Sequence, residues 1–293
     1  IERGLGAERL HRLVARGVLG GGGILQAEGD AVHLVGAGLD RGAAARDGRG
    51  LIYPHPVPPG FGEAIPVAPG VLWMRLSMPI ALNHINVYAV EDGEGWALVD
   101  TGLNIPDSRD RWDALLAGPL GGRPVTRVIC THMHPDHIGL ADWICQRFNA
   151  PLLMSGLDYH VARLACQDQT SFGGDGAALF FYQHGIVSAQ DTEKIKARVH
   201  YYSSLVPSVP KQYQRLLDGQ NISIGLGTEQ SPTRSWKLIS GFGHAPEHMA
   251  LYCEISQILI SGDMVLPRIS TNVSVYDSEP LANPLALFLT TIS

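Results

Sequence analysis

Short apolar runs separated by polar turns dominate the chain from residue 64 onward. Each run holds four to six residues and is rich in Val, Ile, Leu and Trp, a length and composition typical of buried strands. We predict strands at Val71–Leu76, Ile85–Val90, Trp96–Val99, Val125–Cys130, Pro151–Met154, Asn221–Ile224, Trp236–Ser240, Met249–Glu254 and Gln257–Ile260. The acidic and glycine residues of Glu91–Gly95 are typical of a hairpin turn between the second and third strands.

Longer runs with helical spacing lie between the later strands. The predicted helices cover Pro106–Leu116, Ile138–Phe148, Leu157–Cys166, Ala177–His184, Asp191–Leu205 and Asn283–Ile292. Strands that first meander and then alternate with helices indicate an α/β domain with helices outside its sheets. Three consecutive helices without an intervening strand predict a helical insertion at about residues 155–215, because this connection is too long for a simple loop.

The first 60 residues have a different character. Gly, Ala and Arg dominate there, and the pattern supports only a short helix at Glu8–Val18 and a short strand at Ala31–Val35. The proline-rich stretch Tyr53–Gly60 reads as an extended linker and a boundary. We therefore predict a poorly specified leader at residues 1–60, followed by one domain at residues 61–293.

Composition narrows the class of protein. An apolar content of 45% and a charged content of 17% are those of a soluble globular chain. The formal net charge of −6 disfavours a nucleic-acid partner, because phosphates repel an acidic surface. No run approaches the length of a membrane span, and the four cysteines are scattered without the spacing of a zinc finger. These features predict a cytoplasmic protein without a membrane partner, and they leave a homodimer open.

The most specific chemistry lies directly after the predicted strand Val125–Cys130. Three imidazoles and one carboxylate fall within six residues, in the order His132, His134, Asp136 and His137. Such groups repel one another when charged and are costly to bury, and a divalent metal removes that cost. His132 and His134 point the same way from an extended segment, whereas Asp136 and His137 turn into the helix and face a neighbouring position. The pattern therefore predicts two adjacent metal ions.

The string Thr131–Leu140 (THMHPDHIGL) resembles the signature of the metallo-β-lactamase superfamily, in particular its glyoxalase II and lactonase-like branch. This resemblance covers roughly residues 65–293 and implies an αββα sandwich interrupted by the helical insertion. The segment Gly243–His248 resembles the next motif of the family, and the end of the strand before Asp263 resembles the motif after it.

The resemblance also implies a set of site residues. His132, His134 and His244 would bind one metal, Asp136 and His137 would bind the other, and Asp263 would bridge the two. Asp136 would in addition orient the attacking water or move its proton. Two further residues would orient the ligands without binding metal themselves: Asp100 and His248. No histidine follows Asp263, although the family normally supplies a last one, so we expect the chain to be truncated at its C-terminus.

These expectations converge on a hydrolase that uses two divalent metal ions, zinc first and iron or manganese as alternatives, to activate water. The expected substrate is a small ester, thioester, lactone or amide. An iron-dependent sulfur dioxygenase is the main alternative, since it shares the fold. Di-iron reductases usually carry a carboxylate where this chain has His134, which argues against that branch. A nuclease of the tRNA-processing type fits less well, because the sequence lacks a dense basic cluster.

Overall fold

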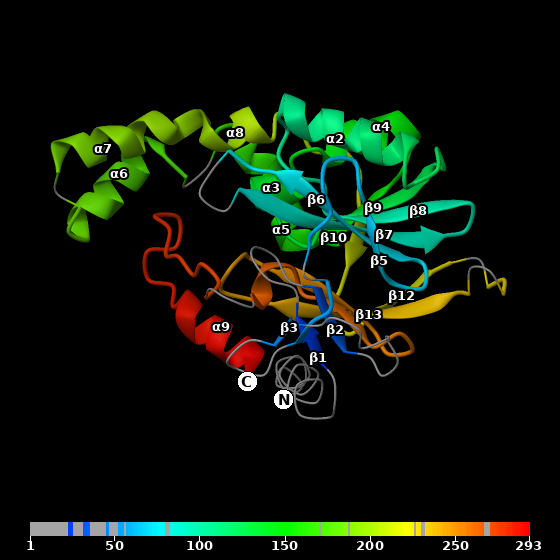
Figure 1. The fold of residues 1–293 in the computed structure, drawn as a ribbon. Helices are drawn as coiled ribbons and strands as arrows, with labels where there is room; N and C mark the ends of the chain where they lie inside the picture. The colour runs from blue at the N-terminus through cyan, green and yellow to red at the C-terminus, as the bar shows by residue number, and fades with distance from the viewer. Residues whose placement is uncertain are drawn as a thin grey trace.

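The structure is a computed structural model of the 293-residue chain (Figure 1). It describes four short strands at residues 23–25, 32–35, 45–46 and 52–53, and then residues 54–55, 57–79, 83–169, 172–186, 188–225, 227–229, 232–266 and 270–293. The helix predicted at Glu8–Val18 lies outside the described residues. The architecture is α/β, with two sheets face to face and helices outside them, as the sequence predicts.

The first sheet has seven strands and changes from antiparallel to parallel pairing halfway across. Its strands are β5 (Ile65–Ala68), β6 (Val71–Ser77), β7 (His84–Asp92), β8 (Gly95–Val99), β9 (Val125–Ile129), β10 (Leu152–Ser155) and β11 (Gln214–Leu216), in the order β11-β10-β9-β8-β7-β6-β5. Strands β5 to β8 pair antiparallel, and β8 to β11 pair parallel. Hairpins suffice for the antiparallel half, whereas β8 and β9 need a helical crossover between them.

The second sheet has eight strands. They are β1 (Gly23–Leu25), β2 (Val32–Val35), β3 (Ala45–Arg46), β4 (Ile52–Tyr53), β12 (Asn221–Ile224), β13 (Arg234–Gly241), β14 (His248–Cys253) and β15 (Ile258–Ile260), in the order β12-β13-β14-β15-β2-β1-β4-β3. Strand β2 pairs antiparallel with β15, so the stretch expected to be a leader contributes strands to this sheet. The predicted boundary at residue 60 stays a prediction.

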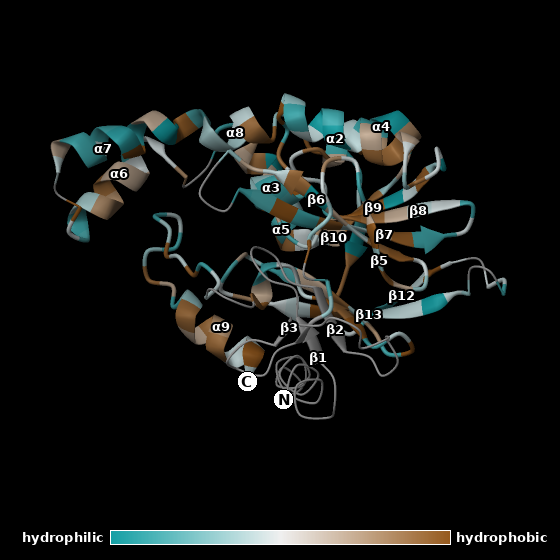
Figure 2. Cartoon of the chain, viewed as in Figure 1, coloured by the Kyte–Doolittle hydropathy of each residue, from teal (hydrophilic) through white to brown (hydrophobic). Residues whose placement is uncertain are grey.

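Alternating side chains along the strands build the layers. On β7, Ile85 and Val87 pack with the helices, whereas Tyr88 and Val90 pack between the two sheets. Because successive side chains of a strand point to opposite faces, a strand that is buried on both faces is apolar at almost every position. On β13, Leu238 faces the other sheet and Ile239 faces the C-terminal helix. Figure 2 shows brown concentrated on strands such as β9 and β13, and teal along the outer helices α2 and α7.

The helices cover the first sheet on its outer face. Helix α2 (Pro106–Ala117) begins with Pro106 and buries Trp112 completely. The single helix predicted at Ile138–Phe148 is wrong in one respect: α3 (Pro135–Ile138) and α4 (Ala141–Phe148) are separate. A Cβ on Gly139 would lie 2.6 Å from the Gly102 carbonyl oxygen, so the loop after β8 packs directly on the chain between the two helices.

The insertion contains α5 (Gly156–Ala165), α6 (Gly174–Gln183), α7 (Ala189–Lys196), the short 3-10 helix η1 (Ala197–His200) and α8 (Tyr201–Leu205). Figure 1 shows α6 and α7 as an arm that projects from the body. Helix α9 (Pro284–Ile292) packs on the outer face of the second sheet through Phe288 and Ile292. Among the described helices, none combines the length and the apolar character needed to cross a lipid bilayer.

Candidate metal centre

The strand topology brings distant loops to one edge of the sandwich. Strands β8 and β9 are parallel neighbours, so Asp100 after the first and His132 after the second leave the sheet on the same side. In the second sheet, Gly241 at the end of β13 pairs with His248 at the start of β14, and β15 ends beside them. A hydrogen bond of 2.8 Å from the Met249 N–H to the Thr131 carbonyl joins the two sheets at this edge.

Three histidine nitrogens meet at one point of this edge. His132 Nε2 lies 2.9 Å from His134 Nδ1, His134 Nδ1 lies 3.0 Å from His244 Nε2, and His244 Nε2 lies 3.1 Å from His132 Nε2. Zinc–nitrogen bonds of about 2.0–2.1 Å place the nitrogens around one ion roughly 2.9–3.4 Å apart. The triangle therefore has the dimensions of a three-histidine metal site.

The hydrogen bonds on the far side of the rings support the same assignment. His244 Nδ1 lies 2.8 Å from the Asn272 carbonyl oxygen, which can only accept, so Nδ1 carries the proton and Nε2 presents its lone pair. His132 Nδ1 lies 3.0 Å from the Thr131 hydroxyl oxygen. Lone pairs that point at one another are unfavourable unless a cation lies between them, so the donor set fits a metal ion.

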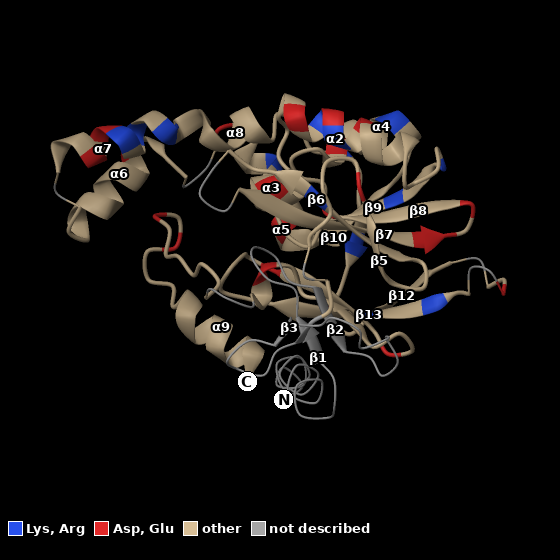
Figure 3. Ribbon diagram, in the orientation of Figure 1, with Lys and Arg blue, Asp and Glu red and all other residues tan. Residues whose placement is uncertain are grey.

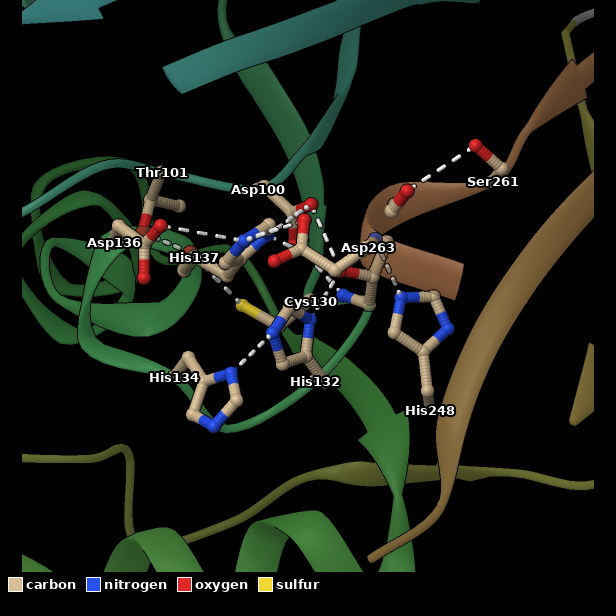
Figure 4. Close-up of polar contacts among 12 residues, drawn as sticks. Asp100, Thr101, Cys130, His132, His134, Asp136, His137, His248, Ser261 and Asp263 are labelled. Carbon is tan, nitrogen blue, oxygen red and sulfur yellow. Dashed lines mark hydrogen bonds and ion pairs between the residues drawn. The ribbon is translucent and has the colours of Figure 1, made fainter. Parts of the chain in front are cut away.

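A second group of donors adjoins the first. His137 Nε2 lies 3.3 Å from Asp263 Oδ1 and 3.5 Å from Asp136 Oδ2. The other carboxylate oxygen of Asp263, Oδ2, lies 3.2 Å from His244 Nε2. Asp263 thus presents one oxygen to each group, and one of its oxygens lies within 4.8 Å of the nitrogens of the three-histidine set. Figure 4 shows the Asp263 side chain directed toward His137, above the His132 ring.

Asp100 and His248 support this arrangement without entering either donor group. Asp100 Oδ1 accepts the Thr131 N–H at 2.8 Å, and Oδ2 lies 2.9 Å from His137 Nδ1. A carboxylate on Nδ1 fixes the proton there and turns the lone pair of Nε2 toward the donor group. His248 Nε2 accepts the backbone N–H of Asp263 at 3.2 Å, which holds the bridging loop. A Cβ on Gly262 would lie 2.3 Å from that nitrogen, so only glycine fits beside it.

The site shifts the pKa of its groups in opposite directions. Burial, and then the neighbouring imidazoles, hold the pKa of His132 and of His134 well below the usual value. Burial also opposes the charged form of His137, but Asp100, Asp263 and Asp136 outweigh it and raise its pKa well above the usual value. Burial raises the pKa of Asp136, although His137 counteracts it. Neutral imidazoles beside carboxylates are the ligand types suited to divalent transition metals.

The three histidines of the insertion lie outside both donor groups. His184 Nδ1 lies 2.7 Å from the Phe180 carbonyl oxygen, and His200 pairs with Asp168 at the surface. His160 packs edge-on against Tyr159. The structure therefore brings together all of the residues that the sequence predicts for the metal site, and leaves these three outside it.

Asp158, a buried carboxylate on α5, was not predicted from the sequence. It accepts the backbone N–H of Met133 at 2.8 Å and that of Glu247 at 2.6 Å. The available signal was local: Ser155, three residues earlier, accepts the Asp158 N–H, and this serine–acid spacing is typical of a helix start. That signal predicts the beginning of α5 and says nothing of the two distant loops that share the carboxylate.

The ionisation of Asp158 gives a pH-dependent stability. Burial raises its pKa from an ordinary 3.8 to about 6, although N–H groups of Glu247 and Met133 counteract it. Because the folded state holds this proton to higher pH, its contribution to stability is fully present below about pH 3 and is lost as pH rises through about 6, with about 2 kcal/mol lost between pH 4 and pH 7. We expect the free energy of unfolding of the metal-free protein, minus that of Asp158→Asn, to decrease by this amount from pH 4 to pH 7. Urea unfolding at intermediate pH values measures it, and a pH-independent difference would contradict it.

Comparisons with known proteins identify solved structures with the same fold. A protein of Burkholderia ambifaria, a beta-lactamase domain protein, has a solved structure that is 41% identical, with a TM-score of 0.73, over 81% of this chain and 66% of that one. The metallo-beta-lactamase family protein TTHA1429 from Thermus thermophilus is 25% identical, with a TM-score of 0.60, over 77% of this chain and 69% of that one.

The sequence comparisons point the same way. The probable metallo-hydrolase YqjP of Bacillus subtilis (strain 168) is 26% identical over 207 residues, which are 69% of this chain and 59% of that protein. The chain thus spans about six-tenths of the length of this relative. The family model of the metallo-beta-lactamase superfamily matches residues 81–290, which include both donor groups. The chain therefore belongs to the metallo-beta-lactamase superfamily.

Proposed function

We propose that the protein is a metal-dependent hydrolase with two divalent metal ions. Zinc is the metal we favour, and iron and manganese are the alternatives. The superfamily and the kinship to a probable metallo-hydrolase support hydrolysis in general. One observation carries the two-metal proposal: the two oxygens of Asp263 face different donor groups, one near His244 and the other near His137.

In this proposal each donor group holds one ion. His132, His134 and His244 would hold the first, Asp136 and His137 would hold the second, and Asp263 would offer one oxygen to each. Bound divalent ions supply Lewis acidity and lower the pKa of water to about 7. Asp136 is half-buried at the edge of the site, and its carboxylate orients the attacking water and takes its proton.

The proposed substrate is a small molecule with an ester, thioester, lactone or amide group. Charges on the insertion argue against a nucleic acid, because the two lysines of α7 pair with acids. Lys194 lies 3.0 Å from Asp191, and Lys196 lies 3.4 Å from Glu193. Figure 3 shows this mixture of blue and red on α7, where a phosphate-binding surface would be uniformly blue.

Metal removal tests the proposal. We expect the purified protein to hydrolyse at least one member of a panel containing an aryl ester, a thioester, a lactone and a β-lactam. Dialysis against a chelator should abolish this hydrolysis, and zinc, manganese or ferrous ion should restore it, because the donor atoms alone cannot activate water. Elemental analysis before and after dialysis gives the metal content.

Two outcomes would contradict the proposal. Hydrolysis that survives complete metal removal would show that the chemistry lies elsewhere. Oxygen uptake with a persulfide, without hydrolysis of the panel, would instead indicate the iron-dependent dioxygenase chemistry. A folded protein that binds no metal under any condition would exclude both.

A further inference from the structure

Two residues of the helical insertion hold the backbone between His132 and His134. Asp158 on α5 accepts the N–H of Met133 at 2.8 Å, and the Tyr202 hydroxyl on α8 donates to the Met133 carbonyl oxygen at 2.6 Å. Met133 is the residue between the two histidines, so both polar groups of its backbone are fixed. Asp158 and Tyr202 are fully buried, which makes these bonds hard to replace by water.

Asp158 also joins this segment to the loop of the third histidine. Its Oδ1 accepts the Met133 N–H, and its Oδ2 accepts the N–H of Glu247, three residues after His244. One carboxylate therefore sets the distance between two loops that lie more than 100 residues apart in sequence. Each oxygen serves one loop, so loss of either bond removes one tie between α5 and that loop.

Tyr202 is itself held rigidly. Its ring stacks on Phe172, with ring centroids 5.6 Å apart. Burial raises the pKa of Tyr202 well above its usual value, so the hydroxyl keeps its proton and remains a donor. The hydroxyl therefore approaches Met133 from a fixed direction.

We propose that Asp158 and Tyr202 are positioning residues, which hold the His132–His134 segment and the His244 loop at the spacing that a metal ion requires. This inference rests on the proposed metal site and extends it to the insertion. Metal–ligand distances tolerate deviations of only about 0.2 Å, whereas loops without such support drift further. The insertion thus serves the metal centre in addition to any part it takes in admitting substrate.

Asp158→Asn tests the carboxylate. An amide has one acceptor oxygen, so one of the two N–H groups must face an NH₂ group. We expect zinc affinity, measured by competition with a chromogenic chelator, to fall about 10- to 100-fold, and the visible spectrum of the cobalt-loaded protein to change. The matched control is Asp92→Asn. Asp92 is a buried carboxylate that accepts the Gly225 N–H at 2.8 Å, at the opposite end of β7 from the site.

Tyr202→Phe is the second variant, since it removes one oxygen atom and keeps the ring. It should weaken zinc binding and alter the cobalt spectrum in the same direction, even where Asp158→Asn fails to fold. Tyr159→Phe is its control, because the Tyr159 hydroxyl donates to the Pro210 carbonyl, also within the insertion. Unchanged affinity and spectrum in Tyr202→Phe, or equal losses in both controls, would overturn the inference. A wild-type protein that binds no zinc would instead overturn the proposed function.

Discussion

Replacement of His134 by alanine should empty the first metal position and reduce hydrolysis by at least about 10³-fold, which corresponds to about 4 kcal/mol of lost transition-state stabilisation. His134 Nδ1 touches both other nitrogens of the triangle, at 2.9 and 3.0 Å. Without it, only two nitrogens and one Asp263 oxygen remain. Elemental analysis and the initial rate of hydrolysis measure the two effects.

The same variant should leave the metal-free fold intact. His134 is crowded by two imidazoles whose lone pairs converge on it, so its removal relieves repulsion in the empty site. We therefore expect thermal unfolding of the metal-free variant to match or exceed that of the wild type. His200→Ala is the control, because His200 is exposed and pairs only with Asp168 at the surface. Full metal content in His134→Ala would contradict the assignment of the triangle.

Much of the fold could be predicted because its signals are local. The strand predicted at Asn221–Ile224 matches β12 at both ends, and the helix predicted from Pro106 begins at that residue. Apolar strands bounded by turns and a proline at a helix start depend on neighbouring residues alone. The edge strands β5 and β11 were missed. With three or four residues and exposed positions, they lack the apolar run that marks a buried strand.

The break between α3 and α4 could not be predicted from local pattern. Residues 138–148 have helical spacing throughout, and Gly139 alone is a weak signal. The helix divides because a distant loop, that of Gly102, lies directly on Gly139. Contacts between segments far apart in sequence leave no trace in periodicity.

The residues of the site also differ in whether the sequence alone identifies them. The segment from His132 to His137 can be recognised as a metal site from sequence, because four candidate metal-binding side chains lie within six residues. His244 and Asp263 were identified by resemblance to family motifs, and the structure brings their donor atoms to the same point. Asp158 and Tyr202 belong to no such motif. Their contribution is a pair of hydrogen bonds to one backbone residue, which only three-dimensional arrangement reveals.

Asp100→Asn should weaken binding of the second metal about 10- to 100-fold while leaving the first nearly unchanged. The carboxylate accepts from the Thr131 N–H, from the Thr131 hydroxyl and from His137 Nδ1. An amide can accept on one side only. If its oxygen faces His137, its NH₂ opposes the Thr131 N–H. If its NH₂ faces His137, the proton of the neutral ring moves to Nε2, and the lone pair that would bind metal is lost.

The backbone conformation at residue 100 accommodates asparagine, so the effect of Asp100→Asn can be attributed to the side chain. Asp100 has a φ of 63°, a conformation that asparagine adopts more readily than most residues, so the change adds no backbone strain. Nitrogen-15 spectra of the imidazoles report the proton position on His137, and stepwise zinc titration separates the two sites. A proton found on Nε2 together with loss of the second zinc would establish the carboxylate as the group that aims His137. Two zinc ions bound at wild-type affinity would show that His137 keeps its orientation without Asp100.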